Sequence, residues 1–379
     1  MLQFARKLRD RQSKSPSFTF SRPLVVLQSD GWGRVGVRDK QGYEALRSKG
    51  LRLGEHPDDL YSLETAADVG SLCDLLTKHR DSINRPPCLV MNFCVANLDF
   101  RRMCEHGFRE VFLLPLSKGL PEGWSRPGLM ESYRSGIRQG VFSPALHGLT
   151  HFCATAVREA LLKNGERAQL LRLLWEEETP YIHWRMPWIG YEFWHPEKPH
   201  QGFIPGESQL ALVRQGYEFF LALFGTVPTS VCAPGYRSNR DTHEAWSRYG
   251  IRVAQSGTAT GLKAPSKDPN GMVHLHRVID FEPARKEMEI EKYLEVARVC
   301  FTSGLPFVIS MQSINFHSSI KDFRTPSLSA LDALLTALES KYPELLYVND
   351  SDVYSIVNEG AFRNRNEKIS ILVTHREGD

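Results

Sequence analysis

The chain has 379 residues, of which 41% are hydrophobic and 24% are charged, and its formal net charge is +3. These values are typical of a globular protein with a sizeable core, and they argue against a disordered chain or a nucleic-acid-binding protein. The N-terminal residues lack the apolar run of a signal peptide, and no apolar run is long enough to cross a membrane. We therefore expect a cytoplasmic protein without a membrane span.

Strand patterns alternate with helical patterns along the chain, and the joints between them are short and often contain glycine. This alternation is typical of βα units and of a largely parallel sheet. We expect strands at residues 23–33, 88–93, 110–114, 141–146, 229–233, 251–255, 273–275, 306–313 and 346–348. We expect helices at residues 63–76, 98–107, 128–140, 156–165, 206–224, 241–250, 327–340 and 351–358, and another that ends near residue 302.

The number of these units favours a closed or partly closed barrel over an open sheet. The predicted fold class is therefore α/β, a distorted (β/α) barrel of about seven βα units. We place the barrel at residues 22–360, between an N-terminal arm at 1–21 and a C-terminal tail at 361–379. An aromatic-rich insertion at 175–205 contains four of the seven tryptophans. These rings either stack on sugar rings or pack a lid onto the barrel.

Polar side chains follow several predicted strands, and the C-terminal ends of parallel strands meet at one rim of a barrel. His147 and His151, in the sequence HGLTH, lie where a strand passes into a helix. Two imidazoles and the carboxylate of Asp30 are a standard ligand set for a divalent metal, and two unrelated loop histidines are the alternative. The polar and aromatic residues expected at the rim are Asp30, Trp32, His147, His151, Tyr236, Arg237, Glu282, Gln312 and Asn315.

The sequences VVLQSDGWG, HGLTH, VCAPGYRSN and PFVISMQSINF, in this order, resemble the motifs of the polysaccharide deacetylases, or NodB-type carbohydrate esterases. SDGWG together with SPALHGLTH resembles a divergent bacterial subgroup of that family. The resemblance implies a NodB-type distorted barrel and the metal-dependent removal of an acetyl group from a sugar. It also implies a metal held by Asp30, His147 and His151, with zinc as the first choice and cobalt or nickel as alternatives.

The chain departs from the family pattern at three chemically important positions. Asp30 is the only carboxylate where the family has an Asp-Asp pair, so it is either the base or the metal ligand. Cys232 replaces the family arginine, for which Arg237 could substitute, and Gln312 replaces the final histidine that acts as an acid. A glutamine cannot transfer a proton, so Glu282 is our candidate for the missing acid or base, with an ordinary surface glutamate as the alternative.

Three functions agree with this sequence. The first is a metal-dependent deacetylase of a glycan or an acetylated sugar, with Asp30, Glu282 and Gln312 at the reacting bond. The second is a non-catalytic carbohydrate-binding barrel that has lost its proton-transfer groups. The third is a barrel glycosidase that uses Asp30 and Glu282 as its two carboxylates. The residues expected to contact the substrate are Trp32, Tyr236, Arg237 and Asn315.

Overall fold

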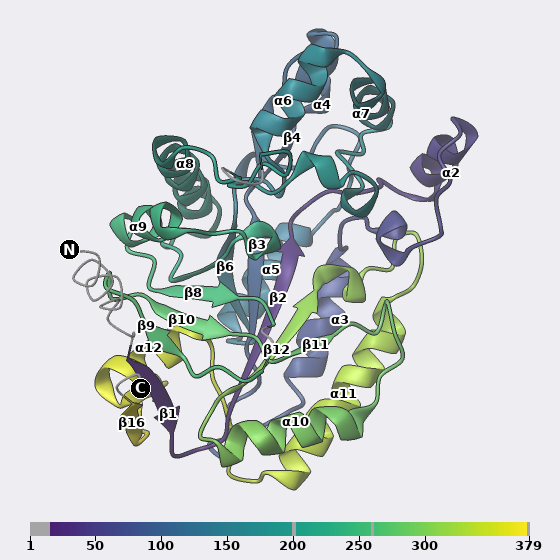
Figure 1. The fold of residues 1–379 in the computed structure, drawn as a ribbon. Helices are drawn as coiled ribbons and strands as arrows, with labels where there is room; N and C mark the ends of the chain where they lie inside the picture. Colours follow the sequence, from purple (N-terminus) through teal and green to yellow (C-terminus); the bar gives the residue numbers. More distant parts are fainter. Residues whose placement is uncertain (1–15, 199–201, 259–260, 377–379) are drawn as a thin grey trace, which may run out of the picture.

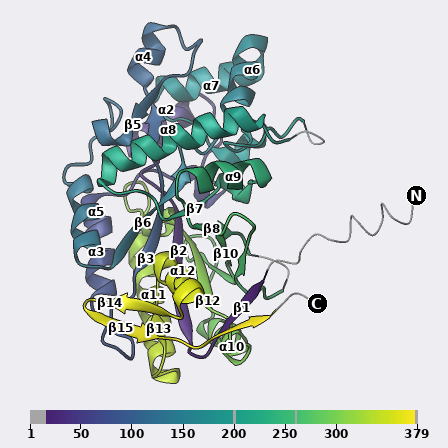
Figure 2. The ribbon, with the colours of Figure 1, turned by 90° about the vertical axis from the view of Figure 1, so that its left-hand side faces the viewer.

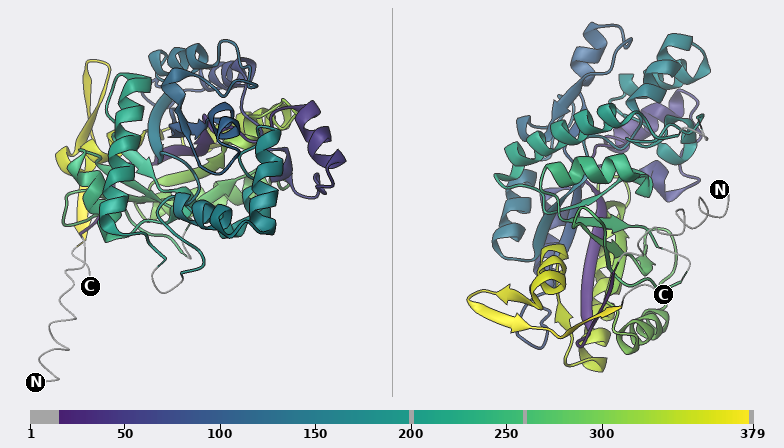
Figure 3. Two further views of the ribbon diagram at one scale, coloured as in Figure 1. Left: turned by 90° about the horizontal axis from the view of Figure 1, so that it is seen from above. Right: turned by 60° about the vertical axis from the view of Figure 1, so that its left-hand side comes forward.

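The structure is a computed structural model, and it describes residues 16–198, 202–258 and 261–376. Its centre is a curled parallel sheet with helices around it (Figures 1 and 3). The apolar runs at residues 24–32, 89–94, 230–232 and 307–312 are almost entirely buried, as expected for parallel strands covered by helices. The strands are β2 (Leu24–Trp32), β3 (Leu89–Cys94), β6 (Phe142–Gly148), β7 (Ser230–Cys232), β8 (Val253–Ser256), β10 (Val273–His276), β11 (Ile279–Phe281) and β12 (Phe307–Gln312).

One extended segment, residues 273–281, closes the sheet into a barrel. Its first half, β10, pairs in parallel with β8, and its second half, β11, pairs in parallel with β12. Between the two halves, the N–H of Arg277 donates to Ser256 and the N–H of Val278 donates to Val308. With β10 and β11 counted as one segment, the eight strands make a seven-stranded barrel in the order β12, β2, β3, β6, β7, β8 and the closing segment. The predicted distorted (β/α) barrel is therefore confirmed.

Helices cover the barrel from outside, and further helices lie in the loops beyond the C-terminal ends of the strands (Figure 1). The covering helices are α3 (Ala66–Leu76), α5 (Leu129–Arg138), α8 (Gly206–Phe224), α9 (Arg240–Arg248), α10 (Ile290–Thr302) and α11 (Arg324–Lys341). The loop helices are α2 (Lys40–Ser48), α4 (Phe100–Glu105), α6 (Ala154–Lys163) and α7 (Glu166–Glu176). Short 3₁₀ turns occur at Pro57–Leu60, Leu116–Lys118, His183–Arg185, Pro187–Ile189, Pro234–Tyr236 and Ser313–Phe316.

One predicted strand lies outside the barrel sheet. The strand predicted at residues 110–114 is β5 (Leu113–Pro115), and it pairs antiparallel with β4 (Ala96–Leu98) in a separate two-stranded sheet. Its residues are only partly buried, whereas all six residues of the neighbouring barrel strand β3 are buried. An apolar run alone does not distinguish these two environments, which explains the error.

The segments expected as arm and tail contribute strands. β1 (Ser17–Phe20) pairs with β16 (Val373–Arg376) and with β9 (Ser266–Lys267), which in turn pairs with β10. β14 (Ala361–Asn364) and β15 (Glu367–Ser370) form a hairpin at the lower end of the molecule in Figure 2. Residues 1–15 of the expected arm lie outside the described residues.

The end of the barrel at which the parallel strands begin is closed by β13 (Leu346–Tyr347), which pairs with β2, and by α12 (Asp350–Glu359). The side chain of Asn349 caps this helix, and the buried carboxylate of Asp350 points into the barrel. Asp350 accepts hydrogen bonds from the amides of Gln28, at 2.8 Å, and Gln255, at 2.7 Å. Burial raises the pKa of Asp350 above its ordinary value. The barrel interior therefore holds a polar network that needs this carboxylate as an acceptor.

We expect Asp350→Ala to lower the free energy of unfolding by about 2–4 kcal/mol, because two buried amide donors lose their acceptor. Urea unfolding at neutral pH measures this change. The matched control is Glu359→Ala, at the exposed end of the same helix, which should change stability by no more than about 0.5 kcal/mol. Equal stabilities of the two variants would contradict the role given to Asp350.

Candidate active site

A cavity of about 260 Å³ lies at the C-terminal ends of the barrel strands. This is the position at which barrels of parallel strands bind their ligands. Five of the residues predicted from the sequence line it: Asp30, His147, His151, Tyr236 and Gln312. The structure therefore brings the HGLTH histidines together with the carboxylate that ends β2.

His147 and His151 face each other, with their ring centroids 5.4 Å apart. The Nδ1 atom of His147 lies 2.8 Å from the carbonyl oxygen of Cys232. A carbonyl only accepts hydrogen bonds, so Nδ1 carries the proton and Nε2 keeps a free lone pair. The Nδ1 atom of His151 is buried without a hydrogen-bond partner. Burial lowers the pKa of both imidazoles, which keeps them in the neutral form that binds metals.

Glu192, from the insertion, holds the turn between these histidines. Its Oε1 atom accepts hydrogen bonds from the backbone N–H groups of Leu149, at 2.8 Å, and Thr150, at 3.3 Å. Gly148 has a φ of +111°, and a Cβ atom there would collide with the Glu192 carboxyl group. Burial raises the pKa of Glu192 to about 8. The turn therefore depends on a glycine and on a largely neutral glutamate.

Asp30 forms a buried, bidentate ion pair with Arg277. Both N···O distances are 2.6 Å, and the side chain of Asn92 donates a further hydrogen bond at 2.8 Å. Burial opposes ionisation of Asp30, but the charge and hydrogen bonds of Arg277 outweigh it, so the pKa of this carboxyl lies below its ordinary value. Asp30 is consequently ionised, and most of its negative charge is balanced by Arg277.

The donor atoms of this site suit a divalent metal. Asp30, His147 and Cys232 each offer a ligand atom within 4.8 Å of the others. The hydrogen bond from His147 Nδ1 to a backbone carbonyl is the usual support of a metal-binding histidine. The unpartnered Nδ1 atom of His151 is a second free donor. Burial raises the pKa of the Cys232 thiol, so this sulfur is a weaker metal ligand than the neutral imidazole of His147 or the carboxylate of Asp30. His151 lies outside the group of donor atoms that meet within 4.8 Å.

Arg277, and not Arg237, contacts Asp30. Cys232 stands at the position where the sequence resemblance leads us to expect an arginine, and the guanidinium of Arg277 lies 3.6 Å from its sulfur atom. Arg237 is exposed, and its guanidinium lies 4.7 Å from the ring centroid of Trp194. The cation that we expected near the site is therefore present, but it comes from the segment that closes the barrel.

Besides Arg237, three further residues predicted for the site do not line the cavity. Trp32 is fully buried and stacks on Phe316, so our interpretation of it as a substrate contact was wrong. Asn315 is also fully buried, and its amide donates to Glu282 at 3.1 Å. The carboxylate of Glu282 lies 3.5 Å from the guanidinium of Arg285, which lines the cavity. Burial raises the pKa of Glu282 to about 7. It is therefore neither a surface glutamate nor a group on the cavity wall.

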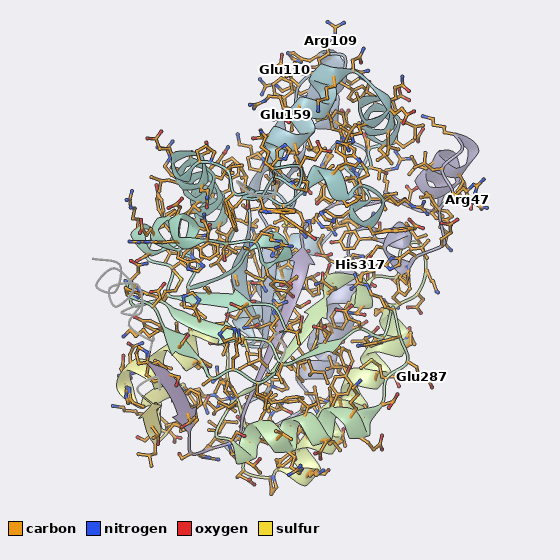
Figure 4. All side chains as sticks on the ribbon, viewed as in Figure 1. Arg47, Arg109, Glu110, Glu159, Glu287 and His317 are labelled. Carbon is orange, nitrogen blue, oxygen red and sulfur yellow. The ribbon has the colours of Figure 1, made fainter. Side chains whose placement is uncertain are left out.

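Gln312 lines the cavity, with its amide nitrogen 3.5 Å from Asp30. The nearest histidine in the sequence, His317, does not replace it. His317 is buried near the upper end of β12 (Figure 4), and its Nε2 atom lies 3.1 Å from the carboxylate of Glu64. This pair fixes the loop after β12 and leaves no imidazole at the position of Gln312.

The aromatic insertion supplies a wall of the cavity. Tyr181, His183, Trp184 and Tyr191 all line it, whereas Trp175 is buried in the core. One part of the insertion therefore packs into the core, and another part faces the cavity. The cavity residues that the sequence analysis missed include Arg34, Tyr61, Arg285 and these insertion residues. For Arg34 a signal was available, because it directly follows SDGWG at the end of the first strand.

The sequence matches no family model, and it matches no curated protein. Solved structures do resemble it. A glycoside hydrolase/deacetylase of Parabacteroides distasonis is 10% identical, with a TM-score of 0.51 over 90% of this chain and 73% of that one. The chain has the deacetylase-type barrel fold. The fold implied by the sequence resemblance is thus confirmed, while these low identities establish the fold alone.

Two further structures are similar over nearly their whole length. A polysaccharide deacetylase of Mycobacterium smegmatis is 11% identical, with a TM-score of 0.45 over 89% of this chain and 91% of that one. A polysaccharide deacetylase of Pseudomonas aeruginosa is 9% identical, with a TM-score of 0.47 over 89% of this chain and 93% of that one.

No helix within the described residues has the length and apolar character that a membrane crossing requires.

The raised pKa of Glu192 predicts a pH-dependent stability. The folded chain keeps this carboxyl protonated up to about pH 8, whereas the unfolded chain loses the proton near 4.5. Stability should therefore fall as pH rises through this window, with a slope of up to about 1.4 kcal/mol per pH unit. Glu192→Gln, which stays neutral and keeps the acceptor oxygen, should have a smaller slope in urea unfolding. The exposed Glu207→Gln should leave the slope unchanged, and an unchanged slope in Glu192→Gln would contradict the prediction.

Proposed function

We propose that this chain is a metal-dependent hydrolase that removes an acetyl group, in the first instance an N-acetyl group, from a sugar or glycan precursor. The observation that carries the proposal is the pair of neutral imidazoles, His147 and His151, beside ionised Asp30 in the cavity of a deacetylase-type barrel. Nitrogen and oxygen donors of this kind suit zinc, with cobalt and nickel as alternatives.

A bound divalent ion would polarise the acetyl carbonyl and make a water molecule a better nucleophile. Arg277 keeps Asp30 ionised and fixes its orientation toward His147. Gln312 has no proton to transfer, so its amide is available to hydrogen-bond the substrate. Tyr236, whose hydroxyl accepts a hydrogen bond from Arg277 at 2.7 Å, forms another polar part of the wall.

Proton transfer then requires a group other than Gln312, and His183 is the remaining imidazole on the cavity wall. Its Nε2 atom donates to the carbonyl of Gly190 at 3.0 Å, which leaves Nδ1 to exchange a proton. Its ring centroid lies 5.2 Å from that of His151. We give His183 the role that the final histidine has in the family motif, although it comes from the insertion.

A carbohydrate-binding barrel without catalysis is the second candidate. The observation in its favour is the close pairing of Asp30 with Arg277, which weakens this carboxylate both as a base and as a metal ligand. The glycosidase alternative has less support. Glu282 does not line the cavity, and the two carboxylates that do, Asp30 and Asp58, are each paired with an arginine.

Protein purified without chelator should contain close to one zinc, cobalt or nickel ion per chain by elemental analysis. His147→Ala and His151→Ala should each lose most of this metal, because each removes a neutral imidazole donor. His106→Ala, exposed and outside both the cavity and the possible metal-ligand groups, serves as the matched histidine control and should retain it. Absence of metal from the parent after reconstitution would contradict the hydrolase and favour the binding barrel.

His183→Gln should keep its metal and lower the rate of acetate release from N-acetylated sugars by at least about tenfold, since general acid–base groups contribute 10²–10⁴-fold. Acetate release and metal content are measured on the same preparation. Full activity would contradict the proton-transfer role of His183, and so would loss of the metal, which would make His183 a ligand instead.

A further inference from the structure

Arg34 lines the cavity without a carboxylate partner among the described residues. The other arginine on the wall, Arg285, lies 2.7 Å from Asp58. The guanidinium of Arg34 instead lies against aromatic rings, 3.8 Å from the ring centroid of Tyr61 and 5.4 Å from that of Tyr181. Cation–π contacts compensate only part of the hydration that a guanidinium loses in a protein. The positive charge of Arg34 is therefore left without a counter-ion.

Unpartnered polar atoms gather around the same guanidinium. The Nε atom of Arg34 and the hydroxyl group of Tyr181 are buried without a well-formed hydrogen bond, although the two side chains lie close enough to attract each other. Both line the cavity, as does His151, whose unpartnered Nδ1 atom is the donor already assigned to the metal. Buried polar atoms are nearly always hydrogen-bonded in folded proteins, and a cluster of exceptions in one cavity indicates where a ligand supplies the missing partners.

We propose that Arg34 and Tyr181 bind a carboxylate group of the ligand, so that the sugar taken by this cavity is an acidic one, such as a hexuronate. The inference uses the proposed function only in taking the ligand to be a sugar. Two N–H groups of a guanidinium match the two oxygens of a carboxylate, and a tyrosine hydroxyl adds a third donor.

The charged groups of the cavity wall single out Arg34 as the site for an anion. Asp30 lies 2.6 Å from Arg277 and Asp58 lies 2.7 Å from Arg285, so both carboxylates of the wall have a cationic partner. Arg34 is the charged side chain of this wall that has no oppositely charged partner among the described residues. The planar fork of its guanidinium matches the two oxygens of a carboxylate, and glucose 6-phosphate serves as the competing phosphate ester in the test.

Isothermal titration calorimetry with two matched ligands tests this inference. Methyl β-D-glucuronide and methyl β-D-glucoside differ only in the carboxylate at C6. The parent should bind the glucuronide at least about tenfold more tightly, as expected for a charge-assisted pair. Arg34→Gln should abolish this preference, and Arg34→Lys should retain part of it, because a lysine keeps the charge but not the planar fork. Arg240→Gln, on the exposed surface of α9, should behave as the parent does.

Equal affinities of the parent for the two glycosides would overturn the proposal, and so would tighter binding of glucose 6-phosphate than of the glucuronide. Thermal unfolding without ligand provides an independent check, because a cation without a counter-ion does not stabilise the fold. Arg34→Gln should keep the unfolding midpoint of the parent, and a large decrease would make Arg34 a structural residue. A preference for the glucuronide in a protein that releases no acetate would support this inference while contradicting the proposed deacetylase.

Discussion

The buried pair of Asp30 and Arg277 is the interaction on which the centre of this barrel depends. Arg277 lies where the closing segment passes from β8 to β12, and its guanidinium reaches side chains of β2, β7, β8 and β12. Removing one partner of such a pair typically costs about 3–5 kcal/mol, because it leaves an unbalanced charge in the interior. Closure of the barrel and ionisation of the carboxylate beside His147 are thus two consequences of one contact.

The sequence was informative where the signal is local. Apolar runs, and glycines at the ends of helices, predicted most strands and helices. The HGLTH motif located two histidines of the cavity. It was not informative where the role of a residue depends on a partner that is far away in the sequence. Arg277 is 247 residues from Asp30, and nothing near it in the sequence indicates that it is buried. Trp32 shows the converse, because an aromatic residue at a strand end looks the same whether it faces a ligand or the core.

The insertion is attached to the barrel by polar contacts as well as by aromatic packing. The carboxylate of Asp59 accepts hydrogen bonds from Trp184, at 2.9 Å, and Arg185, at 2.6 Å. The same carboxylate accepts hydrogen bonds from the backbone N–H groups of residues 54–56. One side chain therefore joins the loop after β2 to the segment that carries His183. The mouth of the cavity is fixed by a contact between two loops.

Glu192 and Gly148 also have a consequence for how related sequences can diverge. The glutamate belongs to an irregular segment, a class of structure that usually tolerates substitution and changes in length. Here its carboxyl group fills the space that a side chain at residue 148 would need. A lineage that acquires a larger residue at 148 must shorten or relocate residue 192, whereas loss of the glutamate removes the collision but not the positive φ that favours glycine there. The two positions should therefore covary among homologues, with the histidine turn and the insertion inherited as a unit.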